Sequence, residues 1–192
     1  ERLSSCGRPT PWVHLALMGD DGKPAAEGEP GEICIRGPLI MKGYKDMPKQ
    51  TAEAFEGGWL HTGDVGRLDE DGFLYIVDRT KDMIVTGGFN VFPREVEDVL
   101  ATHEAVGQVV VIGVPDEQWG ESVKAVVVLK PGVEESDVLE AQLQALVKDK
   151  KGSVQAPKSV DFVAGIPLTP VGKPDKKAVK AQYWEGAARS VG

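Results

Sequence analysis

A carboxylate and a guanidinium are the first side chains in this sequence whose positions favour ligand chemistry. Asp64 ends the segment Trp59-Leu-His-Thr-Gly-Asp64, and Arg79 follows the apolar run Phe73–Val77. A carboxylate at the end of a strand can accept hydrogen bonds from a ribose diol, as an acidic residue does in dinucleotide folds. The planar fork of donors on Arg79 suits a nucleotide. Taken alone, however, Thr-Gly-Asp is more typical of a turn, and the charges of Asp78–Asp82 are more typical of an exposed linker.

Lys173 lies in a segment rich in proline and glycine, Ile166-Pro-Leu-Thr-Pro-Val-Gly-Lys-Pro-Asp175. A lysine at the tip of a loop is a compact cation that can be placed on a phosphate. The segment is not a Walker phosphate loop, because Gly165 and Gly172 are too far apart and Pro174 stands where that loop requires Ser or Thr. Lys173 is therefore a candidate phosphate contact of a different kind.

The paired glycines Gly87 and Gly88 have two interpretations. Adjacent glycines mark a tight turn, and they also let the backbone pass very close to a thin ligand such as a pantetheine arm. The preceding charged cluster includes Lys81, which could lie at a bend between two domains. Position alone does not choose between these interpretations.

Composition excludes several classes of protein. The 192 residues are 41% hydrophobic and 27% charged, which is typical of a soluble globular protein and argues against disorder. The net charge of −8 disfavours nucleic acid as a partner, and no apolar run is long enough for a transmembrane helix. No metal site is predicted, because the cysteines and histidines share no ligand spacing: Cys6, Cys34, His14, His61 and His103. We interpret both cysteines as reduced thiols of a cytoplasmic protein.

The elements that position these residues change in character along the chain. Residues 1–78 hold short apolar runs separated by glycine-bearing turns, which predicts a small antiparallel β-barrel-like subdomain or meander. Residues 83–192 predict an α+β domain, with a helix starting at Pro93, buried strands near 106–114 and 122–129, and a helix capped by Ser136. The join falls at residues 79–82. The predicted fold class is α+β.

The four segments resemble the motifs of the adenylate-forming superfamily, which comprises acyl-CoA synthetases, peptide-synthetase adenylation domains and beetle luciferases. They occur in the family's order over more than a hundred residues: Gly58-Trp-Leu-His-Thr-Gly-Asp64, Asp78-Arg79, Gly87-Gly88 before Pro93-Arg-Glu-Val-Glu97, and Pro167-Leu-Thr-Pro-Val-Gly-Lys173. The resemblance implies a reaction in two steps. A carboxylate attacks the α-phosphate of Mg-ATP to give an acyl-adenylate, and coenzyme A then displaces AMP to give a thioester.

The resemblance also implies a role for each candidate residue. Asp64 and Arg79 would bind the ribose hydroxyls, and Lys173 would bridge the carboxylate and phosphate oxygens during adenylation. Lys81 matches the family's hinge, about which the small domain turns between the two half-reactions. After that rotation, the Gly87–Gly88 segment would border the pantetheine channel.

The sequence lacks two motifs of the family, the Gly/Ser/Thr-rich phosphate loop and the aromatic-Gly-x-Thr-Glu motif. We therefore expect residues 1–78 to be the last subdomain of a larger AMP-binding domain, and the chain alone to be inactive. A fatty acid is the first expectation for the carboxylic acid substrate, and an aryl acid stays open. Two alternatives also stay open: an adenylation domain of a peptide synthetase, and a non-catalytic module that binds nucleotide or coenzyme A.

Overall fold

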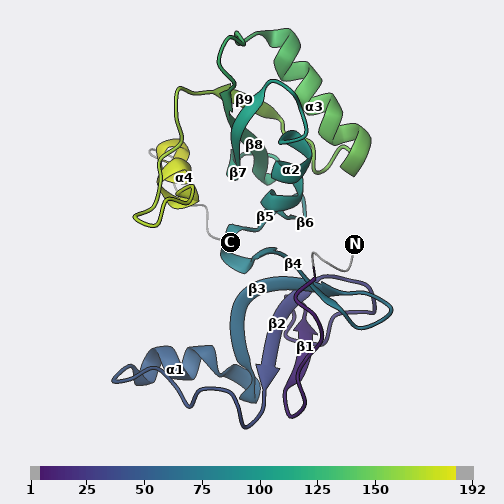
Figure 1. Ribbon diagram of the computed structural model, residues 1–192, viewed down its shortest axis with the longest axis vertical. Helices are drawn as coiled ribbons and strands as arrows, with labels where there is room; N and C mark the ends of the chain where they lie inside the picture. Colours follow the sequence, from purple (N-terminus) through teal and green to yellow (C-terminus); the bar gives the residue numbers. More distant parts are fainter. Residues whose placement is uncertain (1–4, 185–192) are drawn as a thin grey trace. The chain divides into compact units, whose positions relative to one another are not determined.

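The computed structural model describes residues 5–184, and the chain forms two compact units, residues 1–81 and 82–192. The boundary between Lys81 and Asp82 falls within the segment predicted as a join. Residues 1–4 and 185–192, the outer ends of the two predicted domains, lie outside the described residues. The α+β class is confirmed, since both units combine antiparallel strands with helices (Figure 1).

The first unit is a four-stranded antiparallel sheet in which each strand pairs with the next along the chain. Of the two arrangements expected, the described strands therefore adopt the meander. A short helix and a 3-10 turn connect the second and third strands (Figure 1). The elements are β1 (His14–Met18), β2 (Gly31–Arg36), α1 (Pro48–Ala54), η2 (Glu56–Gly58), β3 (Leu60–Leu68) and β4 (Leu74–Arg79).

A small core holds this sheet together. Ile33, Cys34 and Val65 are buried in the central strands. Gly66 lies beside them, and a Cβ atom there would come within 2.8 Å of the Ile33 side chain. The absence of a side chain at Gly66 thus lets Ile33 pack directly over the strand.

The second unit is a mixed sheet with helices on both faces. Its strands follow the order β6-β5-β8-β7, and β9 pairs parallel to β8. A 3-10 turn, η3 (Thr80–Asp82), spans the boundary between the units. The elements are β5 (Ile84–Thr86), β6 (Phe89–Val91), α2 (Pro93–Leu100), β7 (Val106–Asp116), β8 (Gly120–Leu129), α3 (Asp137–Lys151), β9 (Ser159–Phe162) and α4 (Lys176–Trp184).

Each face of this sheet has its own apolar cluster. Helices α2 and α3 cover one face, where Val96, Leu100 and Leu143 pack against the strands. Helix α4 covers the other face through Val179 (Figure 1). Strands β7 and β8 contain the apolar runs 109–114 and 125–129, most of whose residues are buried between the helices on the two faces. The predicted cap is present, since the Ser136 hydroxyl accepts a hydrogen bond from the Leu139 amide at 3.2 Å.

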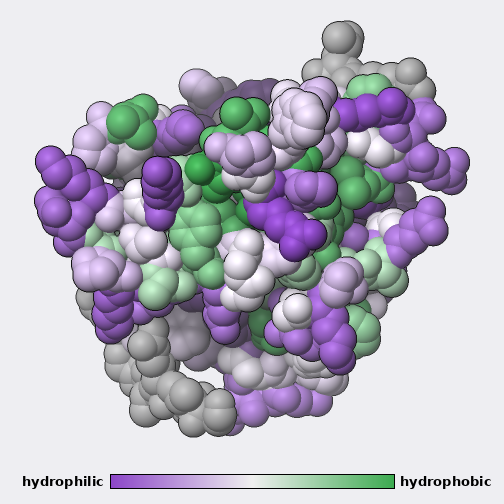
Figure 2. All heavy atoms as spheres, turned by 90° about the horizontal axis from the view of Figure 1, so that it is seen from below, coloured by the Kyte–Doolittle hydropathy of each residue, from purple (hydrophilic) through white to green (hydrophobic). Residues whose placement is uncertain are grey.

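The face shown in Figure 2 mixes hydrophilic side chains with exposed hydrophobic ones. In the first unit, several of the latter lie in the connection between β2 and β3, including Leu39, Met41, Tyr44 and Met47. Among residues 5–184, no helix is long and apolar enough to cross a membrane.

Candidate functional site

Asp64 and Arg79 lie opposite one another on neighbouring strands. Their Cα atoms are register partners in the β3–β4 ladder, and the Arg79 Nε atom is 3.5 Å from Asp64 Oδ1. Both side chains are partly open to solvent, with exposed fractions of 61% for Arg79 and 36% for Asp64. The pair therefore offers a carboxylate and a fork of N–H donors side by side at an accessible sheet edge.

The backbone before Asp64 is braced by Glu32 and Thr62. Gly63 has φ of 74°, a left-handed conformation that glycine adopts without strain, and its amide donates to Glu32 Oε1 at 3.0 Å. The Thr62 hydroxyl donates to the carbonyl of Ile33 and accepts from the Asp64 amide. The Thr-Gly-Asp segment is thus a bulged strand fixed to β2, which directs Asp64 toward Arg79.

Lys173 lies in a hairpin-like loop between β9 and α4. Thr169 closes this loop, because its amide donates to the Lys173 carbonyl at 2.7 Å and its hydroxyl accepts from the Lys173 amide at 3.2 Å. Gly172 completes the turn at φ of 77°. Lys173 itself is exposed, so the loop presents an ammonium group on an ordered backbone.

Helix α4 follows this loop and is fixed to the sheet by polar contacts. Asp175 starts the helix by accepting from the Ala178 amide, and Lys176 forms a 2.9 Å ion pair with Glu97 of α2. Lys180 forms a 2.9 Å ion pair with Glu121 of β8. Near the other end of the helix, the Trp184 indole donates to the carbonyl of Gly113 at 3.0 Å. The Lys173 loop is therefore anchored on its helical side.

Tyr183 adds a further contact between α4 and the sheet. Its hydroxyl donates to Asp161 Oδ2 at 2.7 Å, and Lys124 binds the other oxygen of Asp161 at 2.6 Å. Burial and the neighbouring carboxylate raise the pKa of Tyr183 to about 12. Burial raises the pKa of Asp161, but the bonds from Lys124 and Tyr183 outweigh it and leave the pKa below its usual value.

Gly87 and Gly88 form the two-residue turn of the β5–β6 hairpin. Both have positive φ, 56° and 81°, as a type I′ turn requires. Trp119 packs on this turn: its carbonyl accepts from the Gly87 amide at 3.0 Å, and a Cβ atom on Gly87 would come within 2.6 Å of its ring. The Trp119 ring is half-exposed and covers one side of the glycine turn.

Glu121 is a linking residue that sequence reasoning missed. One carboxylate oxygen pairs with Lys180 of α4, and the other accepts from the Val85 amide of β5 at 3.2 Å. The carboxylate connects the helix after the Lys173 loop to the strand before the glycine turn. The signal in the sequence was only a Gly-Glu pair after Trp119, which does not reveal two partners 36 and 59 residues away.

The other predicted residue, Lys81, lies in η3 at the unit boundary. Asp64 and Arg79 belong to the first unit, whereas the glycine turn and Lys173 belong to the second. Within the first unit, the structure brings Asp64 and Arg79 together.

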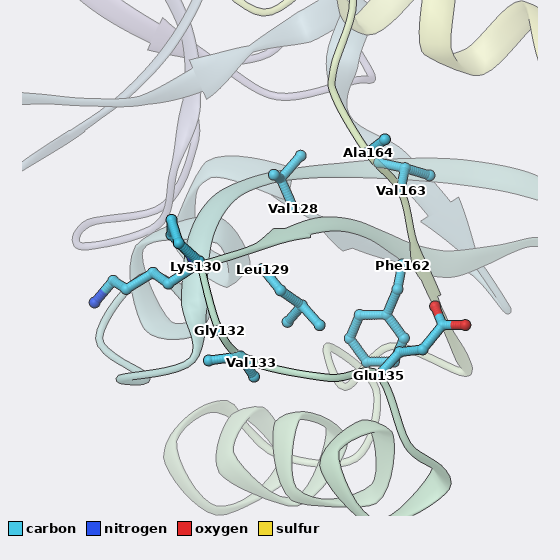
Figure 3. A pocket seen from close by; sticks show the side chains of 10 residues that line it. Val128, Leu129, Lys130, Gly132, Val133, Glu135, Phe162, Val163 and Ala164 are labelled. Carbon is cyan, nitrogen blue, oxygen red and sulfur yellow. The ribbon is translucent and has the colours of Figure 1, made fainter.

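A shallow recess of about 400 Å³ lies elsewhere on the second unit, between the ends of β8 and β9 and the loop before α3. Leu129, Val133 and Phe162 line it, and the Lys130 side chain extends away from it (Figure 3). The recess contains none of the predicted site residues.

Comparisons with known proteins match segments of both units to related family models. Residues 95–173 match the family model of the AMP-binding enzyme C-terminal domain, and residues 1–45 match that of AMP-binding enzyme. A medium/long-chain fatty-acid–CoA ligase of Mycobacterium tuberculosis is 60% identical over 196 residues, covering 100% of the chain and 34% of the ligase. A long-chain fatty-acid–CoA ligase of Bacillus subtilis is 45% identical, covering 88% of the chain and 30% of the ligase.

A solved structure shares the fold at similar coverage. The amide bond synthetase of Marinactinospora thermotolerans superposes with a TM-score of 0.81 at 43% identity, covering 94% of this chain and 37% of that protein. The chain spans about a third of the length of the curated relatives that it matches.

Proposed function

Because the chain belongs to the AMP-binding, adenylate-forming enzymes, we propose that it is part of an ATP-dependent acyl-CoA synthetase that activates a fatty acid. The ligase names of its relatives and the ordered Asp64–Arg79, glycine-turn and Lys173 segments support this proposal. The observation that carries most weight is the match to a fatty-acid–CoA ligase along the whole chain.

In the first half-reaction, the first unit would hold the nucleotide sugar. The Asp64 carboxylate would accept hydrogen bonds from the two ribose hydroxyls, and Arg79, its register partner, would donate to the same sugar. The bulge at Gly63 fixes the backbone of Asp64 before any ligand binds. Such preorganisation reduces the entropy lost on binding.

Lys173 would supply the charge that adenylation needs. The transition state concentrates negative charge on the attacking carboxylate and on the α-phosphate oxygens, and a cation placed between them lowers its energy. The Thr169 bonds and helix α4 define the backbone from which the Lys173 ammonium group reaches these oxygens. Loss of such a group raises the barrier by about 3 kcal/mol.

In the second half-reaction, the β5–β6 turn would line the path of coenzyme A. A Cβ atom on Gly88 would meet no atom within 4 Å, so the turn presents bare backbone to a thin ligand at this glycine. Rotation about the segment at Lys81 would exchange the Lys173 loop for this turn at the active site.

Mg-ATP enters this scheme as a substrate. Among residues 5–184, one cluster contains three or more side chains of the kinds that bind metals, namely Glu32, Cys34 and His61. Mg²⁺ prefers ligands that are all oxygen atoms, and this cluster does not provide such a set. The phosphate chain and its Mg²⁺ are thus assigned to other parts of the full-length enzyme. For the same reason, we expect the 192-residue chain alone to catalyse no ATP–pyrophosphate exchange.

The test is to compare the full-length enzyme with its Lys173→Ala variant. We expect fatty acids to support ATP–pyrophosphate exchange, and the variant to lose about 10²-fold of that rate or more. The variant should still convert supplied acyl-adenylate to the thioester, because Lys173 would act only in the first half-reaction. Exchange at the wild-type rate in the variant, or no exchange with any acid, would refute the proposal.

A second candidate differs in the acceptor. The similarity to an amide bond synthetase supports a reaction in which an amine, instead of the coenzyme A thiol, attacks the same acyl-adenylate intermediate. Supplying the enzyme with acid, ATP and either coenzyme A or a panel of amines separates the two. Thioester as the main product supports the synthetase, and amide as the main product supports the second candidate.

A further inference from the structure

Three potential metal ligands meet on one face of the first sheet. Glu32 and Cys34 are two residues apart on β2, so their side chains point to the same face. His61 on β3 is the register partner of Cys34 and joins them there. The His61 Nδ1 atom lies 2.7 Å from Glu32 Oε2 and 3.4 Å from Cys34 Sγ. The ligand atoms of the three residues all lie within 4.8 Å of one another.

The donor set indicates which cation would fit. Thiolate and imidazole select Zn²⁺ and other borderline or soft ions over Mg²⁺ and Ca²⁺, and a carboxylate oxygen completes many zinc sites. Zinc bonds of about 2.0–2.3 Å in a tetrahedral site separate the ligand atoms by roughly 3.4 Å. The Sγ–Nδ1 distance already has this value. The shorter Nδ1–Oε2 distance would need to lengthen by roughly 0.7 Å, which is a small rotation of Glu32.

The surroundings also favour a cation. Cys34 is completely buried, whereas His61 and Glu32 keep 29% and 23% of their side chains exposed, so an ion and a water ligand can approach from their side. A divalent cation bound to Cys34 Sγ would replace the proton of the thiol, and its positive charge would be offset by the neighbouring Glu32 carboxylate.

A hydrogen bond around the cluster orients one ligand. The Gly63 amide donates to Glu32 Oε1 and leaves Oε2 directed at His61. Zinc ligands in proteins are held in place by such outer hydrogen bonds. We propose that Glu32, Cys34 and His61 form a site for a single zinc-class divalent cation, with the His61 Nδ1, Cys34 Sγ and Glu32 Oε2 atoms as its ligands.

The proposal does not depend on catalysis and is tested spectroscopically with Co²⁺, a stand-in for Zn²⁺ that absorbs light. The purified protein, kept reduced, is titrated with Co²⁺ alone and then with Zn²⁺. We expect one Co²⁺ per chain, a near-ultraviolet thiolate-to-cobalt charge-transfer band, and loss of that band when Zn²⁺ displaces Co²⁺. Absence of the band in the folded wild-type protein would overturn the proposal.

Variants assign the ligands. Cys34→Ala should abolish the band, and His61→Gln and Glu32→Gln should each weaken Co²⁺ binding by about tenfold or more. Cys6→Ser is the matched control, because Cys6 is the other thiol and is exposed, and it should keep the band. A band that disappears in Cys6→Ser, or full affinity in the folded His61→Gln variant, would also contradict the site.

Discussion

Asp64 and Arg79 are neighbours because of backbone pairing and not because of their charges. They are opposed in the β3–β4 register, and their ion pair is open to solvent. An exposed pair of this kind contributes less than about 1 kcal/mol to stability. Substitution of Asp64 should therefore affect ATP binding if the residue has a functional role, and mainly stability if its role is structural.

We expect Asp64→Ala in the full-length enzyme to change the free energy of unfolding by less than about 1 kcal/mol. The KM for ATP should rise about tenfold or more, because the ribose loses an ionised acceptor. Urea denaturation and initial rates at varied ATP measure the two quantities. Glu70→Ala, an exposed substitution in the next turn, should alter neither. Lower stability with an unchanged KM would assign Asp64 a purely structural role.

The two glycines of the β5–β6 turn differ in a way that two substitutions can measure. Alanine at either position must adopt positive φ, at a cost of about 1–2 kcal/mol. At Gly87 the new Cβ atom would also collide with the Trp119 ring, whereas at Gly88 it would meet no atom within 4 Å. Gly87→Ala should therefore lower the thermal midpoint more than Gly88→Ala and change Trp119 fluorescence. Equal midpoints would contradict the packing of Trp119 on the turn.

At the scale of elements, helix α4 anchors the Lys173 loop to the sheet of the second unit. Removing the side chain in Glu121→Ala breaks contacts to both α4 and β5, and we expect it to lower the free energy of unfolding by about 2 kcal/mol. Both half-reactions should slow, because this carboxylate holds the helix after the Lys173 loop and the strand before the glycine turn. Glu121→Gln, which can still accept hydrogen bonds, should restore much of the loss.

The control for this prediction is Glu117→Ala in the exposed turn between β7 and β8, which should leave stability and both rates unchanged. If Glu121→Ala behaves like that control, then Val179 and the other apolar contacts of α4 suffice to hold the loop.

The sequence predicted elements best where one local pattern decided the structure. Ser136 caps α3 and Pro93 begins α2, because capping and helix starts depend on neighbouring residues. The contacts of Glu121 and the grouping of Glu32 with Cys34 and His61 were not predictable. They depend on which elements become neighbours in the fold. The contacting residues are 27 to 59 positions apart, and no local sequence pattern indicates that they meet.

At the scale of the whole molecule, Lys81 is important because it lies at the boundary between the two units. The 3-10 turn Thr80–Asp82 joins a sheet that would hold the sugar to a unit that carries both the Lys173 loop and the glycine turn. One unit can serve two half-reactions only if this short connection permits more than one arrangement. Its backbone freedom is therefore expected to matter more than its side chains.

Lys81→Pro in the full-length enzyme tests that expectation. Proline fixes φ near −65° and restricts Thr80 as well, so it should favour one arrangement over the other. We expect ATP–pyrophosphate exchange and thioester formation from supplied acyl-adenylate to fall by different factors. Lys81→Ala removes the charge but keeps the backbone free, and it should affect both rates less. Equal loss of both half-reactions in the proline variant would mean that the connection is a rigid spacer, and the second unit would then need another route between its two roles.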